Sequence, residues 1–245
     1  MIIIIILIIL VLLLLTHNCN NIKIENFSLD KLEKYLINLD SRKDRFDVTN
    51  NLLNQYNFKN VIRYPAVNGK NISNNELIQI IEPSAMKSIL DNYRKEHHEL
   101  SYGAVGCYLS HINLWKKLEI DNLDYIIIFE DDANPAFSFI ELQEIIKNNA
   151  PNDWDIILFG GIYNNYKNIN NYIDKIYSFY EMHAYIINKK GSIKLLSKAF
   201  PIKKQIDSWL SDLASNNYVN IYGITQNKWS QNPQISNTDI QTEIK

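Results

Sequence analysis

The chain has 245 residues, of which 46% are hydrophobic, and a formal net charge of -2 at pH 7. That length and apolar content suffice for one sizeable core. Because the charge is close to balanced, no nucleic-acid partner is expected. The two cysteines, Cys19 and Cys107, exclude a disulfide framework and give no reason to expect a cysteine metal site. Cys107 is interpreted as a small buried hydrophobic residue.

Residues 2–15 form an unbroken aliphatic run, which the polar sequence THNCNN follows. A membrane-spanning helix needs about 20 apolar residues, so this run is short for a span. Its length fits the apolar part of a secretory signal. We therefore expect residues 1–20 to be a signal peptide or a short signal-anchor. Either would place the protein in the secretory pathway, in the lumen of the endoplasmic reticulum or Golgi, or associate it with a membrane; a buried N-terminal strand is the weaker alternative.

Beyond this leader, short apolar runs alternate with helical patterns. The predicted strands are residues 34–40, 61–69, 125–129, 153–161, 182–191 and 218–224, and the predicted helices are residues 41–58, 101–120, 192–200 and 205–217. Residues 70–100 are polar and predicted to be helical in pieces. Continuous apolar strands between helices indicate an α/β fold with a mostly parallel central sheet flanked by helices. We expect residues 30–240 to form a single domain.

The strand at residues 125–129 runs directly into Glu130, Asp131 and Asp132. Ligands of such sheets bind beyond the carboxyl ends of the strands. Adjacent carboxylates repel one another, and a bound divalent cation would offset that repulsion. Mg²⁺ and Mn²⁺ are commonly bound by one or two carboxylates together with substrate phosphates. The alternative is an acidic loop that faces solvent.

Several segments of the chain together resemble glycosyltransferase family 25, the lipooligosaccharide and procollagen-type galactosyl- and glucosyltransferases. They occur in the family's order and span residues 35 to about 239: YLINLDSRKDRF, YPAVNGK, GAVGCYLSHINLW, YIIIFEDDANP, DWDIILFGG, HAYIINKKGSIKLL and QIDSWLSD. The pairing of GC-x-LSH with EDD is the most specific element. The resemblance implies a GT-A-type fold, a UDP-galactose or UDP-glucose donor, Mn²⁺ or Mg²⁺, and inversion at the anomeric carbon.

The resemblance also implies roles for individual residues. Asp132 and Glu130 would hold the metal, and Asp207 would be the catalytic base. The residues expected near the nucleotide-sugar are Asn38, Asp40, Arg42, Arg45, Glu130, Asp131, Gly160 and Gly161. Arg42 and Arg45 could instead form surface ion pairs with neighbouring acids, and Asp207 could simply stabilise a helix N-terminus.

Two histidines, His111 and His183, lie in segments that resemble the family. His111 is expected to be a hydrogen-bonded core residue, because its neighbours are apolar. The role of His183 is left open, with a contact to either sugar among the possibilities.

The expected function is metal-dependent, inverting transfer of galactose or glucose from a UDP-sugar to a hydroxyl of a glycan or protein. A catalytically inactive binding module with the same fold is the alternative. A nucleotidyl- or phosphotransferase is disfavoured, because the chain has no Walker loop and no G-x-G-x-x-G motif. A metal hydrolase is disfavoured because no H-E-x-x-H motif occurs.

Overall fold

The computed structural model describes residues 32–226 and 228–235, and the predicted leader lies outside them. An eight-stranded sheet forms the centre, in the order β2-β1-β3-β8-β5-β9-β7-β6. Its strands are β1 (Glu33–Asn38), β2 (Val61–Pro65), β3 (Tyr125–Glu130), β5 (Ile156–Leu158), β6 (Ile162–Asn168), β7 (Ile173–Tyr180), β8 (Ala184–Asn188) and β9 (Ile221–Ile224). A smaller antiparallel pair joins β4 (Ala133–Asn134) to β10 (Ser230–Gln231).

The sheet is mixed. β1 pairs in parallel with β2 and β3, and β5 pairs in parallel with β9. β8 and β7 run against both of their neighbours. The predicted α/β class with a helix-flanked central sheet is confirmed, and six strands (β1, β2, β3, β5, β6 and β9) point the same way. The pairing itself is less parallel than expected, because the two reversed strands make four of the seven ladders antiparallel.

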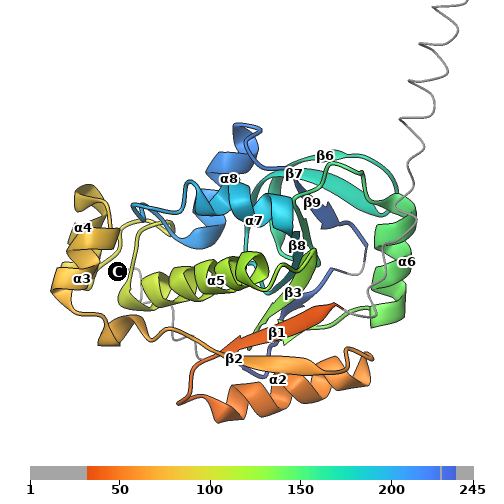
Figure 1. The fold of residues 1–245 in the computed structure, drawn as a ribbon, viewed down its shortest axis with the longest axis horizontal. Coiled ribbons are helices and arrows are strands. Elements are labelled where there is room, and N and C mark those ends of the chain that lie inside the picture. The colour runs from red at the N-terminus through yellow and green to blue at the C-terminus, as the bar shows by residue number, and fades with distance from the viewer. Residues whose placement is uncertain (1–31, 227, 236–245) are drawn as a thin grey trace, which may run out of the picture. The chain divides into compact units, whose positions relative to one another are not determined.

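Helices cover the sheet on both sides. Helices α5 (Tyr102–Ile120), α7 (Lys189–Leu196) and α8 (Ile206–Ser215) lie side by side (Figure 1). They share a core with one set of alternate strand residues, such as Tyr35 and Ile128. The other set of alternate strand residues, such as Phe129, faces α2 (Lys43–Gln55) and α6 (Phe139–Asn149). On that side the ring of Phe58 packs edge-on against Phe129 and Phe139.

Three parts of the fold were not predicted from the sequence. They are α6, the short β4–β10 pair and the β6–β7 hairpin. The first strand of that hairpin reads IYNNYKN and is mostly exposed. Because that strand has almost no buried face, its sequence lacks the apolar alternation that marks a strand. The segment predicted as pieces of helix contains η2 (Gly69–Asn71), α3 (Asn74–Ile80), η3 (Pro83–Ala85) and α4 (Met86–Leu90).

The strand register brings distant residues to one edge of the sheet. Ile37, near the end of β1, pairs with Glu130 at the end of β3. β8 runs in the opposite direction, so its first residue, Ala184, pairs with Phe129. The backbone N–H of Glu130 therefore donates to the carbonyl of His183, with N and O 2.8 Å apart. The last residues of β1 and β3 and the residue before β8 meet at this edge.

Two glycines let helix α5 cross the chain next to this edge. A Cβ atom on Gly106 would lie 2.3 Å from the carbonyl oxygen of Val67, and one on Gly69 would lie 1.7 Å from that of Tyr102. Both distances are far below ordinary contact, so only glycine permits this approach. The crossing places the segment that contains Lys70 against the N-terminal half of α5.

Candidate active site

The carboxylates that follow β3 are held by side chains from other elements. Arg45 of α2 is buried, and its Nη2 lies 2.6 Å from Asp131 Oδ1 and 3.1 Å from Asp132 Oδ2. Asn38 Nδ2 donates to Asp131 Oδ2 at 2.7 Å, and Thr49 Oγ1 donates to the carbonyl of Asp131 at 2.7 Å. Burial raises the pKa of Asp131 to about 6, although Arg45 and Asn38 oppose the shift. The cluster is an ordered, partly buried site rather than a solvated loop.

His183 lies on the other side of Asp132. Its Nδ1 is 3.0 Å from Asp132 Oδ1, and its Nε2 is 3.3 Å from Glu181 Oε2. Burial alone would lower the pKa of His183, but the hydrogen bonds to these two carboxylates raise it to about 10. Burial opposes ionisation of Asp132, yet His183 and Arg45 lower its pKa. Without a bound cation, Asp132 is thus an anion between two cationic side chains.

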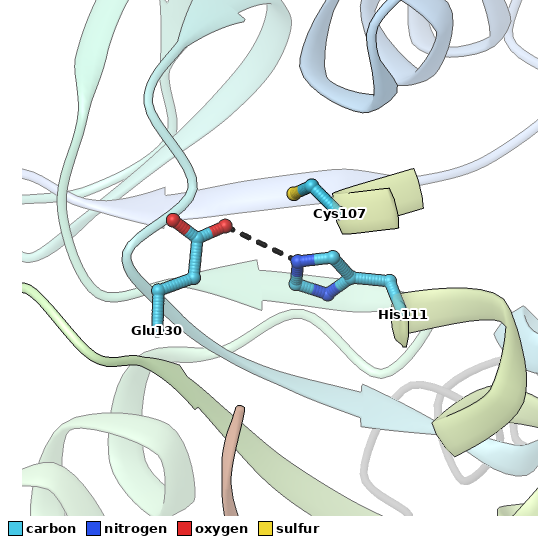
Figure 2. Close-up of side chains that lie close together, drawn as sticks. All are labelled: Cys107, His111 and Glu130. Atoms are coloured by element: carbon cyan, nitrogen blue, oxygen red, sulfur yellow. Dashed lines mark hydrogen bonds and ion pairs between the residues drawn. The ribbon is translucent and has the colours of Figure 1, made fainter. Parts of the chain in front are cut away.

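His111 is buried, as expected, and it also contacts the acidic cluster (Figure 2). Its Nε2 lies 3.1 Å from Glu130 Oε1, and its Nδ1 lies 2.8 Å from the hydroxyl of Tyr185. Trp115 Nε1 donates to the same hydroxyl at 2.9 Å. The prediction that His111 is a hydrogen-bonded core residue is therefore confirmed. Its contact with Glu130 also connects the core to the acidic cluster.

Two cavities border the acidic cluster. The first, about 210 Å³, is lined among others by Asn38, Arg45, Asn68 and Lys70. The second, about 460 Å³, is lined among others by Tyr180, Glu181, His183, Gln205, Asp207 and Gln231. Cys107, Glu130 and Asp132 line both. A molecule in one cavity would therefore contact the same carboxylates as a molecule in the other.

Asp207 reaches the second cavity from the first turn of α8. Its carboxylate accepts hydrogen bonds from the backbone N–H of Ser208 at 2.6 Å and of Glu181 at 3.3 Å. Burial nevertheless raises the pKa of Asp207 above its ordinary value. A carboxyl with a raised pKa in a cavity is suited to accept a proton.

Two residues expected at the nucleotide, Arg42 and Asp40, do not line either cavity. Arg42 pairs with Asp44, with Nη2 and Oδ2 3.1 Å apart, which is the surface ion pair considered as its alternative. Asp40 pairs with Arg63 at 2.7 Å, and its side chain is 81% exposed. Of the two arginines in the motif, only Arg45 lines the first cavity.

The glycine pair after β5 contacts protein backbone. A Cβ atom on Gly160 would lie 1.9 Å from the carbonyl oxygen of Trp229. Gly161 has φ +126°, and a Cβ atom there would lie 2.5 Å from the carbonyl oxygen of Glu181. The close approach of neighbouring backbone thus explains why glycine occupies each of these two positions. Neither glycine is among the residues that line the two cavities.

The cluster fits a divalent cation. Glu130, Asp132 and His183 each offer one ligand atom, and these atoms lie within 4.8 Å of one another. The two carboxylates are the kind of ligand that Mg²⁺ and Mn²⁺ prefer, whereas the imidazole nitrogen is a ligand that softer divalent ions prefer. A cation would take over from protonated His183 in offsetting the repulsion among the carboxylates, because an imidazole must release its second ring proton before it binds a metal. His183 is the residue that sequence reasoning did not assign, since only the β3–β8 register brings it to Asp132.

The sequence profile of glycosyltransferase family 25, described as LPS biosynthesis protein, matches residues 31–210. This chain therefore belongs to glycosyltransferase family 25. It is 29% identical over 189 residues to a glycosyltransferase 25 family member of Drosophila melanogaster, covering 73% of this chain and 29% of that protein. It is 30% identical over 188 residues to procollagen galactosyltransferase 1-A of Xenopus laevis, covering 71% and 29%.

These alignments have a limited extent. The chain spans less than a third of the length of the curated relatives named above. Among solved structures, an apo UDP-glucose pyrophosphorylase superposes with a TM-score of 0.42 at 12% identity, covering 82% of this chain and 92% of that one. That score is too low to define a shared fold, so the family assignment depends on the sequence match.

Proposed function

We propose that this chain transfers galactose or glucose from a UDP-sugar to a hydroxyl group of a glycan or protein, with a divalent cation and with inversion at the anomeric carbon. One observation carries the proposal. A cluster of carboxylates that can hold a cation forms a wall of two cavities, and the second of these contains a carboxyl group with a raised pKa. Family membership supports glycosyl transfer, and the name of the Xenopus laevis relative supports galactose as one candidate sugar.

The first cavity suits the nucleotide diphosphate. Lys70 and Arg45 supply positive charge there, and Asn38 supplies a side-chain amide. Guanidinium and ammonium groups are the usual partners of phosphate oxygens. Glu130, Asp132 and His183 would hold Mn²⁺ or Mg²⁺, which, when bound, stabilises the negative charge that develops on the departing diphosphate.

The second cavity suits the acceptor. Asp207 would accept the proton of the acceptor hydroxyl as its oxygen forms a bond to the anomeric carbon. The bond from that carbon to the diphosphate oxygen breaks, and its electron pair leaves with UDP. One base suffices for this single displacement, whose geometry depends on both substrates being held in line.

The proposal includes a location of the enzyme in the secretory pathway or at a membrane. A secretory or membrane-associated enzyme follows from the expected leader at residues 1–20. Within residues 32–226 and 228–235, none of the helices has the length and apolarity needed to cross a bilayer.

The test uses the full chain and a matched pair of variants on α8. UDP-galactose and UDP-glucose are each titrated with and without Mn²⁺, while thermal stability and UDP release are followed. Asp207→Asn should keep Mn²⁺-dependent stabilisation by one donor but lose about 10²- to 10⁴-fold in transfer. Asp212→Asn is the control, because Asp212 is exposed and pairs with Lys204 at 2.7 Å. A chain that binds neither donor would instead support the inactive binding module.

A further inference from the structure

A second group of metal-ligating side chains shares Glu130 but uses neither Asp132 nor His183. Cys107 and His111 are four residues apart on α5, so their side chains project from the same helix face. Figure 2 shows both beside Glu130, which comes from the end of β3. One ligand atom from each of the three residues lies within 4.8 Å of the other two. His111 Nε2 and Glu130 Oε1 are already 3.1 Å apart.

The chemistry of this set differs from that of the oxygen-rich cluster. A thiolate, an imidazole and a carboxylate are all ligands of Zn²⁺, whereas Mg²⁺ and Mn²⁺ prefer oxygen. Zn²⁺ lies about 2.0–2.3 Å from such donors, and a zinc site with three protein ligands keeps one position open for water or another ligand. Cys107 lines both cavities, so a cation in either cavity would lie close to this residue.

The surroundings of His111 support a ligand role. A metal-bound histidine usually donates its second ring N–H to an oxygen, which orients the ring. The Tyr185 hydroxyl lies 2.8 Å from His111 Nδ1 and is itself held by Trp115 Nε1 at 2.9 Å. A phenol oxygen has lone pairs for both donors. In the structure Nε2 faces the carboxylate of Glu130, which can only accept, so Nε2 carries a proton there. On binding, the cation would replace that proton, and Nδ1 would carry the ring proton.

We propose that Cys107, His111 and Glu130 form a Zn²⁺ site. On binding, the S–H bond of Cys107 is replaced by an S–Zn bond, and the thiol proton passes to solvent. Burial raises the pKa of the Cys107 thiol, so without a metal this cysteine is protonated and is not an activated nucleophile. The proposal gives Cys107 a role beyond that of the small buried hydrophobic residue expected from the apolar helical pattern around it.

A bound Zn²⁺ would withdraw Glu130 from the Glu130–Asp132–His183 set. Zn²⁺ would therefore weaken Mn²⁺ binding and inhibit the proposed transfer. This consequence depends on the proposed function, whereas Zn²⁺ binding itself does not.

The test is optical titration of the full, reduced chain with Co²⁺, a spectroscopic substitute for Zn²⁺. Co²⁺ bound to a thiolate gives a near-ultraviolet charge-transfer band, which added Zn²⁺ should remove. Cys107→Ser should lose the band. Cys19→Ser is the matched control and should keep it, because these are the two cysteines of the chain. Absence of the band from the parent, or its persistence in Cys107→Ser, would overturn the site.

A second measurement tests the competition. Mn²⁺ binding is followed by electron paramagnetic resonance with and without one equivalent of Zn²⁺. Zn²⁺ should weaken Mn²⁺ binding by about tenfold or more in the parent and much less in Cys107→Ser. An equal effect in both proteins would overturn the competition. If no protein binds Mn²⁺, the metal dependence of the proposed function fails, while the cobalt band still decides the zinc site. Cys107→Ala replaces the serine variant if circular dichroism shows that the latter is unfolded.

Discussion

His183 Nδ1 lies 3.0 Å from Asp132 Oδ1, where the reversed strand β8 begins beside the end of β3. The two residues are 51 positions apart in the chain, and the contact links the acidic motif to the second cavity. It also identifies an imidazole that can complete a cation site with two carboxylates.

The first prediction concerns His183. Replacing it with glutamine removes one candidate ligand but retains a polar side chain. Mn²⁺ affinity should fall by at least about 10- to 100-fold, as measured by electron paramagnetic resonance. His98→Gln is the control, since His98 is exposed and lines neither of the two cavities. Unchanged Mn²⁺ affinity in His183→Gln would remove this histidine from the site.

The second prediction compares the two arginines of the first motif. Arg45→Gln leaves Asp131 and Asp132 without their buried guanidinium partner, which should lower the free energy of unfolding by about 3–5 kcal/mol. Arg42→Gln removes a pair with exposed Asp44 and should change stability little. Urea denaturation of both variants measures the difference. Similar losses of stability in the two variants would show that the buried ion pairs of Arg45 stabilise the fold no more than the exposed pair of Arg42 does.

The third prediction is a gain in stability at Asp207. The pKa of Asp207 is higher in the folded protein than in the unfolded chain. Asp207 therefore contributes favourably to folding stability at pH values below the unfolded-state pKa. That contribution is lost as the pH rises through the folded-state pKa. At neutral pH the partly buried carboxylate therefore opposes folding. Asp207→Asn should melt at a higher temperature than the parent at pH 7, and the gain should shrink toward pH 4. A lower melting temperature at pH 7 would indicate that the two backbone hydrogen bonds dominate.

The fourth prediction is a pH profile of transfer. A base must be ionised to accept a proton, so kcat/KM should fall as pH decreases through the raised pKa of Asp207. The acidic limb should lie above the range of an ordinary carboxyl group, about pH 4. Asp131, with a pKa of about 6, could produce a similar limb. Retention of the limb in Asp131→Asn would assign it to Asp207, and its loss would assign it to Asp131.

The fifth prediction tests the crossing of α5 over the Val67–Lys70 segment. Alanine normally stabilises a helix interior by about 1 kcal/mol relative to glycine. At position 106 the new Cβ would lie 2.3 Å from the carbonyl oxygen of Val67, so Gly106→Ala should instead destabilise the protein. Because Lys70 follows the crossing, UDP binding should weaken as well. A higher melting temperature with unchanged UDP binding would show that the crossing relaxes at little cost.

Local patterns in the sequence were sufficient for much of the fold. The helix at α5 and the strands at β1, β3 and β8 were predicted, because apolar periodicity reports which face of an element is buried. The position of Glu130, Asp131 and Asp132 just beyond a buried strand also follows from local order. Family resemblance singled out Asp207, and the structure places it in a cavity that Glu130 and Asp132 also line.

Tertiary structure alone decided which polar residues meet. Arg42 and Arg45 look equivalent in the sequence, but Arg42 precedes α2 as its non-helical N-cap residue, whereas Arg45 lies in the first turn of the helix and pairs with Asp131 and Asp132. His183 reaches Asp132 because β8 is antiparallel to β3, a direction that its own apolar sequence does not encode. The sequence by itself determined the acidic motif and those helices and strands whose buried faces show apolar periodicity, since these depend on near neighbours. The partners of that motif depend on strand order and direction, which long-range packing determines.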